Sequence, residues 1–281
     1  MIKFADANSP LERAEAVVIG VCFEGTVSFR KGTACAPDAI RKEAHNFETF
    51  LMEHGVDLLE AEVHDAGNLT GFETVGAMMA EVEKAVRALA SGHRFIVVLG
   101  GEHLITVPTV KGLGASRVIV LDAHLDFRDD YEGERYSHAC TSRRIAELVG
   151  TEHIYQIGVR SACAEELRDA EQMGLRFSTA KDVREAGIVE ICAEAERLLG
   201  SGPLHLSLDI DVIDPAYAPA TGTPEPFGLS PLDVKRVVER FAPRLVGMDV
   251  VEVCPPHDSG NTASLAARLI REALGLRLLG K

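Results

Sequence analysis

Several features are scarce in this sequence, and each scarcity excludes a class of protein. Lys and Arg number 29 against 43 Asp and Glu, a net charge of −14 that disfavours a nucleic-acid partner and is compatible with a cationic ligand. The six cysteines form no Cys-X-X-Cys pair, which favours free thiols over disulfides or a zinc-thiolate site. No signal-peptide pattern opens the chain, and no apolar run approaches the roughly 20 residues of a membrane span. We expect a cytoplasmic protein without a membrane partner.

The remaining composition predicts one folded domain. A hydrophobic content of 46% in 281 residues is ample for a core and excludes global disorder. No repeat, low-complexity tract or Ser/Gly/Pro-rich linker divides the chain, so we expect a single domain over residues 1–281.

Apolar runs and helical periodicity alternate along the chain. The predicted buried strands are Ala16–Cys22, Val56–Val63, Phe95–Leu99, Val118–Leu121, Ile154–Val159, Leu175–Phe177, Leu204–Leu208 and Leu245–Val253. The predicted helices are 37–52, 75–89, 138–149, 162–173, 180–199, 231–241 and 262–279. Alternation of this kind indicates a parallel sheet, either open or closed into an eight-stranded barrel. In both architectures functional residues gather at the carboxyl ends of the strands.

The segment "DAHLD" places Asp122, His124 and Asp126 at alternate positions directly after an apolar run. Side chains two apart in a strand point to the same face, so these three would converge on one small space. Such a group is costly without a neutralising cation, which favours a metal site over a solvated strand end. Mixed imidazole and carboxylate ligands suit manganese, iron, zinc or nickel, and disfavour calcium.

Two further segments supply similar groups at predicted strand ends. "VVLGGEH" ends in a histidine that, taken alone, favours a structural role, and "SLDID" repeats the alternate spacing of two acids. Together the candidate metal ligands are His103, Asp122, His124, Asp126, Asp209 and Asp211. Six ligands are too many for one ordinary catalytic ion, and they predict a pair of divalent ions that activate a shared water.

Other polar residues near these strand ends are candidates for substrate contact. Glu252 lies in an apolar strand context and needs a cationic partner, either a structural arginine or a cationic substrate. Asp249, in the same run, is predicted to have a structural or supporting role. The polar loop 127–144 is either a solvated loop or a cover over the site that supplies His138 as an acid-base group. Thr223 lies in a Pro- and Gly-rich loop and either contacts substrate or caps that loop.

The ordered motifs "GGEH", "DAHLD", "SLDIDVIDPAYAPATGTPEP" and "VVEV" resemble the ureohydrolase family of arginases, agmatinases and formiminoglutamases. They span residues 97–253, and "GTVSFRKGTACAPDAIR" is similar to the N-terminal region of that family. Four motifs in order are far more specific than any one of them. The resemblance implies a three-layer α/β/α fold with an eight-stranded parallel sheet, the arginase/deacetylase-like fold, rather than a barrel.

The resemblance also implies two Mn(II) ions per chain and roles for single residues. One ion would be held by His103, Asp122, Asp126 and Asp209, and the other by Asp122, His124, Asp209 and Asp211. Asp126 would accept a proton from the attacking water, His138 would pass a proton to the leaving group, and Glu252 would bind the guanidinium. Thr223 would line the site, and the chain would assemble as a homo-oligomer, a trimer or hexamer.

The implied reaction is hydrolysis of a guanidino compound to urea and a primary amine. Agmatine, converted to putrescine in polyamine biosynthesis, is favoured because acids after "DAHLD", among them Asp129 and Asp130, suit a substrate tail with a second positive charge. Arg128 could instead pair locally or meet a carboxylate, and Phe227 stands where a glycine is common in the family. Aminopropylagmatine, arginine, guanidinobutyrate and formiminoglutamate are alternative substrates.

Two other functional classes are less favoured by the sequence. A deacetylase on a related fold would need a single zinc site, whereas six candidate ligands are present. A metal-binding protein without catalytic activity is disfavoured because His138 accompanies the complete ligand set.

Overall fold

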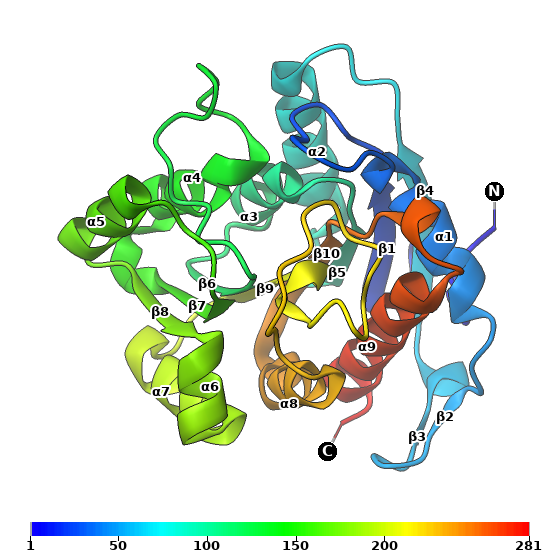
Figure 1. The fold of residues 1–281 in the computed structure, drawn as a ribbon. Coiled ribbons are helices and arrows are strands. Elements are labelled where there is room, and N and C mark those ends of the chain that lie inside the picture. Colours follow the sequence, from blue (N-terminus) through cyan, green and yellow to red (C-terminus); the bar gives the residue numbers. More distant parts are fainter. Residues whose placement is uncertain (1, 281) are drawn as a thin grey trace.

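A computed structural model describes residues 2–280 and centres on an eight-stranded parallel sheet (Figure 1). In spatial order its strands are β4 (Val63–Leu69), β1 (Ala16–Val21), β5 (Phe95–Leu99), β10 (Leu245–Val251), β9 (Leu204–Asp209), β6 (Arg117–Leu121), β7 (Ile154–Val159) and β8 (Arg176–Thr179). The strands β4 and β8 each pair with one neighbour only, so the sheet is open. The predicted fold class is confirmed, and the barrel is excluded.

Helices cover both faces of the sheet (Figure 1). One layer contains α1 (Ala36–Ala44), α6 (Ala180–Ala186), α7 (Ile188–Leu199), α8 (Pro231–Phe241) and α9 (Asn261–Leu278). The opposite layer contains α2 (Val75–Leu89), α3 (Thr106–Leu113), α4 (Thr141–Val149) and α5 (Ala164–Met173). Because both faces of the sheet are covered, its inner strands are buried along almost their whole length, and β1 and β5 are apolar throughout.

Local signals explain where several helices begin. Thr74, Thr179 and Ser230 have extended backbones, and their hydroxyl oxygens accept hydrogen bonds from backbone N–H groups in the first turns of α2, α6 and α8. Pro231 then occupies the first turn of α8, where its missing N–H is tolerated.

The predicted strand Val56–Val63 is wrong, because the edge strand β4 begins at Val63 instead. Residues 56–57 form a small antiparallel pair with Phe50–Leu51. The strand β4 is rich in polar residues and therefore forms no apolar run that would predict it. It is stabilised by Asp65, whose carboxylate accepts hydrogen bonds from Nε and Nη2 of the buried Arg41 of α1 at 2.8 and 2.9 Å.

Three helix predictions also differ from the structure. The first helix ends at Ala44 rather than near residue 52, because the chain turns into the short antiparallel pair. The predicted helix 180–199 is two helices that are separated at Gly187, which has a φ of 85°. The helix α3 was not predicted, because its sequence "TVPTVKGL" contains a proline and two β-branched threonines, and most of it is buried.

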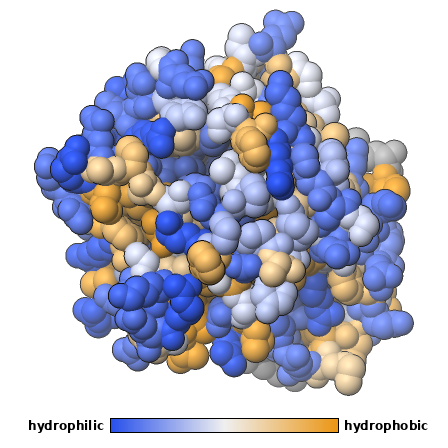
Figure 2. Space-filling view, viewed as in Figure 1, coloured by the Kyte–Doolittle hydropathy of each residue, from blue (hydrophilic) through white to orange (hydrophobic). Residues whose placement is uncertain are grey.

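Among residues 2–280, no helix is both long enough and apolar enough to span a bilayer. On the face seen in Figure 1, hydrophobic side chains are scattered among hydrophilic ones (Figure 2).

Candidate metal centre and active site

The four central strands β5, β10, β9 and β6 carry the sequence motifs at their carboxyl ends. His103 follows the turn after β5, where its Nδ1 lies 3.1 Å from Asp126 Oδ2, 3.2 Å from Asp122 Oδ2 and 3.4 Å from Asp209 Oδ2. His124 Nδ1 lies 2.9 Å from Asp211 Oδ2 and 3.7 Å from Asp122 Oδ1. The structure thus brings all six predicted ligands together.

These side chains form two groups that could each hold a cation, and the groups share Asp122. One consists of His103, Asp122 and Asp126, the other of Asp122, His124 and Asp211. The shared Asp122 is fully buried, and its Oδ2 accepts no hydrogen bond from the described part of the chain. Four carboxylates around two imidazoles, with Asp122 Oδ2 beside His103 but without a hydrogen bond of its own, fit a pair of divalent ions.

The protonation of the cluster reflects its excess of acids. Burial, helped by the charge of Asp122, raises the pKa of Asp126 to about 7. Burial and the charge of Asp211 raise the pKa of Asp209 well above its usual range. Burial opposes protonation of His124, but Asp211 and Asp122 overcome it and raise its pKa to about 12. Bound protons therefore neutralise part of the negative charge of these acids, and binding of a divalent ion would release those protons.

A chain of hydrogen bonds orients His103. Ser207 of β9 donates its hydroxyl proton to Asp249 Oδ1 at 2.7 Å, and its Oγ lies 3.2 Å from His103 Nε2. Since that hydroxyl already donates to Asp249, Ser207 Oγ accepts a hydrogen bond from Nε2–H, and Nδ1 faces the acids. The second oxygen of Asp249 lies 2.7 Å from Nε2 of the buried His205. This agrees with the supporting role expected of Asp249.

The loop beside Asp211 is fastened by Arg160, which follows β7. Its guanidinium donates to the carbonyl oxygens of Asp211 and Glu225 at 2.7 Å each, and to those of Val212 and Gly158 at 3.2 Å. These bonds join the second group of candidate ligands to the Pro- and Gly-rich loop. The carbonyl oxygens of Asp211, Val212 and Glu225 therefore share one donor side chain.

Replacing Arg160 by Lys is expected to lower the stability of the protein by roughly 2 kcal/mol, because an ammonium group cannot reproduce the planar fork of donors. Thermal unfolding and titration with Mn(II) would measure the effect, and weaker binding of one ion is expected. The control is Arg184→Lys, since the exposed Arg184 makes one hydrogen bond, to Phe227 O at 2.9 Å in the same loop. Equal behaviour of the two variants would contradict the role given to Arg160.

Two of the predicted site residues have left-handed backbones. The φ angles of Asp126 and Glu252 are 49° and 60°, a region that costs a residue with a side chain roughly 1–3 kcal/mol. Phe227, in the nearby Pro- and Gly-rich loop, shares this conformation with a φ of 67° and is 78% exposed. The left-handed backbones of Asp126 and Glu252 direct their two carboxylates toward a common space.

That space is a cavity of about 230 Å³. Glu252, His138 and Thr223 line it, as expected from the sequence, together with members of the ligand cluster. Glu252 Oε1 accepts a hydrogen bond from the backbone N–H of His103 at 2.7 Å. A Cβ on Gly222 would lie 2.8 Å from Glu252 Oε2, so glycine is needed there for close approach.

The expectation for Asp129 and Asp130 differs from the structure, since neither lines the cavity. Asp129 accepts a hydrogen bond from Arg144 at 2.6 Å, and Asp130 caps the turn at Gly133. The acid missed by sequence reasoning is Glu166, which lines the cavity as the third residue of α5. Only its capping-box position three residues after Cys163 marked it, and that signal indicates a helix start rather than a site.

Arg128 also lines the cavity. Its guanidinium lies over the ring of Tyr131, 4.8 Å from the centroid, and its Nε is 3.6 Å from Glu166 Oε2. Both oxygens of Glu166 already accept backbone N–H groups, from Phe127 at 2.7 Å and from Cys163 at 3.2 Å. Arg128 is therefore held in place while its terminal nitrogens make no hydrogen bond to residues 2–280, which leaves them available to an anion.

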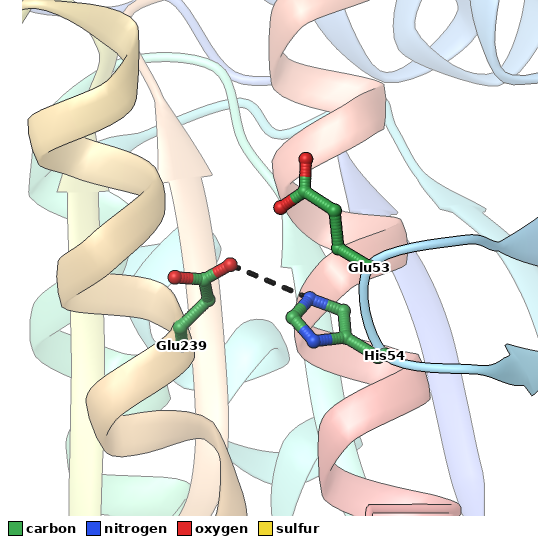
Figure 3. A group of neighbouring side chains, drawn as sticks. All are labelled: Glu53, His54 and Glu239. Carbon is green, nitrogen blue, oxygen red and sulfur yellow. Dashed lines mark ion pairs between the residues drawn. The ribbon is translucent and has the colours of Figure 1, made fainter.

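A third group of metal-type side chains lies away from this cavity (Figure 3). Glu53 and His54, in the turn between β2 (Phe50–Leu51) and β3 (Val56–Asp57), face Glu239 of α8. Lys235 Nζ lies 2.8 Å from Glu239 Oε1 and also pairs with Glu53. Since a lysine already neutralises these acids, we interpret the group as an ion-pair cluster that fastens the turn to α8.

Comparisons with known proteins extend over nearly the whole chain. A sequence model of the arginase family matches residues 14–275. The crystal structure of agmatine ureohydrolase of Thermoplasma volcanium has a TM-score of 0.94 and 41% identity, covering 99% of this chain and 94% of its own. The agmatinase of Pyrococcus horikoshii is 33% identical over 271 residues, 95% of this chain and 93% of its own length. The guanidinobutyrase of Pseudomonas aeruginosa is 33% identical over 293 residues, which are 98% and 90% of the two chains.

Proposed function

This chain belongs to the arginase family of hydrolases that act on guanidino compounds, and we propose that it converts agmatine to putrescine and urea with two Mn(II) ions bound. One observation carries the proposal: the six-ligand cluster and Glu252 converge on one small cavity. A cluster for metal alone would not need a strained, buried acid beside it. The predicted trimer or hexamer and the cytoplasmic location stay predictions.

The chain offers ligands for two ions. His103, Asp122, Asp126 and Asp209 would hold one, and Asp122, His124, Asp209 and Asp211 would hold the other. Bound divalent cations supply activation of water as a nucleophile at neutral pH and neutralise the buried acids.

Glu252 would bind the guanidinium of the substrate. Burial, with the charge of Glu102 adding to it, raises the pKa of Glu252 to about 8. A planar cation beside its Oε2, in the space left by Gly222, would favour the ionised form and orient the guanidinium carbon toward the attacking water.

Two other groups would manage the protons. Asp126, with its pKa near 7, would accept and hold the proton of the attacking water. As the bond between the guanidinium carbon and the tail nitrogen breaks, Nε2 of His138 at the cavity wall would take up the proton held by Asp126 and pass it to that nitrogen. The hydroxyl of the intermediate loses its proton to solvent as urea forms, and the amine takes up one proton from solvent, so the products are urea and an alkylammonium ion.

Arg128 supports a second candidate substrate class, guanidino compounds with a carboxylate tail. Its side chain lines the cavity, and an anionic tail would pair with the guanidinium, whereas the ammonium tail of agmatine would meet the same positive charge. Glu166 and Glu225 also line the cavity and are the groups that would favour agmatine or aminopropylagmatine.

The decisive experiment compares agmatine with 4-guanidinobutyrate, which have tails of similar length that end in an ammonium group and a carboxylate, respectively. Urea from agmatine by the manganese-loaded protein is the expected result. Replacing Arg128 by Gln is expected to raise the ratio of kcat/KM for agmatine over that for 4-guanidinobutyrate by about tenfold, because one charge pair across a small cavity is worth roughly 1.4 kcal/mol.

Arginine, aminopropylagmatine and formiminoglutamate complete the panel, and Arg135→Gln is the matched control. The exposed Arg135 belongs to the same loop but pairs with Glu147 outside the cavity, so its ratio should not change. Turnover of 4-guanidinobutyrate in preference to agmatine would replace agmatine by the second class. No product from any of these compounds would refute the proposed function itself.

A further inference from the structure

We propose that Glu102 and Thr26 are positioning residues that fix the proton of His138 on Nδ1, so that Nε2 exchanges protons with the substrate. The inference rests on the proposed function for the role of His138, but the hydrogen bonds that carry it can be tested without turnover. They join three parts of the chain: the loop after β1, the turn after β5 and the segment that precedes α4.

The loop after β1 is fastened to the "GGEH" turn by Glu102, which is fully buried. One carboxylate oxygen, Oε2, accepts the backbone N–H groups of Gly25 and Thr26 at 2.8 Å each. The backbones also touch, since a Cβ on Gly101 would lie 1.9 Å from Phe23 O. The hydroxyl of Thr26 is therefore held at a defined place relative to the turn.

The hydroxyl of Thr26 has one proton, which it donates in a hydrogen bond to Glu102. Thr26 Oγ1 lies 2.7 Å from Glu102 Oε1, which as a carboxylate oxygen can only accept. Oγ1 also accepts the backbone N–H of His138 at 3.0 Å and lies 3.2 Å from its Nδ1. Because its proton is already used, Oγ1 can bind Nδ1 only as an acceptor, so Nδ1 carries the hydrogen.

This arrangement leaves the lone pair of the neutral imidazole on Nε2. Ser28 Oγ lies 3.3 Å from Nε2, and both Ser28 and His138 line the cavity. The ring is further fixed by an edge contact with Tyr131, with centroids 5.7 Å apart. Glu102, Thr26 and His138 thus form a carboxylate–hydroxyl–imidazole series whose last nitrogen faces the substrate space. A second such series, Asp249–Ser207–His103, turns the opposite nitrogen of its histidine toward the metal ligands.

The test is Thr26→Val, which keeps the shape of the side chain and removes the hydroxyl. We expect kcat to fall about ten- to thirtyfold with KM within about twofold, because proton delivery contributes roughly 10²–10⁴ and only its alignment is lost. Thr26→Ser restores the hydroxyl and is expected to stay within about threefold of the parent. The control is Ser137→Ala, which removes the other hydroxyl near Nδ1, at 3.4 Å, and should leave kcat unchanged.

A second measurement reads the proton directly. In the full-length protein labelled with ¹⁵N-histidine and loaded with diamagnetic Mg(II), long-range ¹H–¹⁵N correlations distinguish the two tautomers. The His138 signals are identified by their loss in His138→Gln. The parent and Thr26→Ser should show Nδ1–H, and Thr26→Val should show a mixture or Nε2–H.

The outcomes separate this inference from the proposed function. A parent in the Nε2–H form, or an unchanged tautomer and kcat in Thr26→Val, would overturn the positioning role even if urea is produced. The Nδ1–H form in a protein that hydrolyses no guanidino compound would uphold the hydrogen-bond series while refuting the proposed function.

Discussion

Replacing Asp209 by Asn is expected to lower urea production by at least about 10³-fold, or about 4 kcal/mol of transition-state stabilisation. Asp209 Oδ2 lies 3.4 Å from His103 Nδ1, and its Oδ1 accepts the backbone N–H of Asp211 at 2.9 Å. The carboxylate therefore stands between both groups of candidate ligands. An amide keeps the hydrogen bond from Asp211 but cannot bridge two cations, so we expect the measured Mn(II) content to fall below two ions per chain.

The stability of the same variant shows whether this loss is local. Asn has the shape of Asp and removes a buried acid whose pKa is already raised, so the metal-free variant should unfold at the same temperature as the metal-free parent or above it. Added Mn(II) should stabilise the parent much more than the variant. Full metal content with unchanged turnover would contradict the assignment of Asp209 as a shared ligand.

The metal-free protein is expected to lose stability as the pH rises from 5 to 8, on the order of 4 kcal/mol or roughly 10 °C in Tm. The pKa values of Asp126 and Glu252 are raised to about 7 and about 8, mainly by burial. Between their unfolded and folded pKa values, the folded chain binds more protons than the unfolded chain, so stability falls with increasing pH. Burial lowers the pKa of His138 to about 4, so this histidine makes the folded chain more stable as the pH rises to the unfolded pKa of histidine. This gain offsets only part of the stability lost through Asp126 and Glu252.

Thermal unfolding with and without Mn(II) at each pH measures this effect. Metal binding requires deprotonated ligands, so the stabilisation by Mn(II) should widen as the pH rises. Glu252→Gln is the informative variant, because it removes one of the two titrating groups and should flatten the pH dependence of the metal-free protein. A metal-free protein that becomes more stable between pH 5 and 8 would be inconsistent with protonated acids in the cluster.

Much of the architecture and the ligand cluster follows from local patterns in the sequence. The strands that carry the ligands are buried and mostly apolar, and the alternate spacing of Asp122, His124 and Asp126 predicted that their side chains come together, although these residues lie just beyond the end of β6. The edge strand β4 could not be found in this way, because its polar side chains are stabilised by Arg41, a partner from another element.

The residues that surround the ligands were harder to predict because their roles depend on distant partners. A hydroxyl such as Thr26 or Ser207 has no sequence signature until the fold brings a carboxylate and an imidazole to its two sides. The tail contacts show the same limit. Asp129 lies shortly after the "DAHLD" segment, but its side chain binds Arg144 instead of lining the cavity. Glu166 lines the cavity although it lies in the first turn of a helix.

The strand order has a consequence for how the site comes into being during synthesis. The last strand in sequence, β10, lies between β5 and β9 and is the only described strand that pairs with both. Until residues 245–251 emerge from the ribosome, the strands β4-β1-β5 and β9-β6-β7-β8 have no ladder to join them. Contacts over such sequence separations form slowly, so we expect a nascent chain without β10 to keep His103 apart from its acids and to bind the proposed metal ions late.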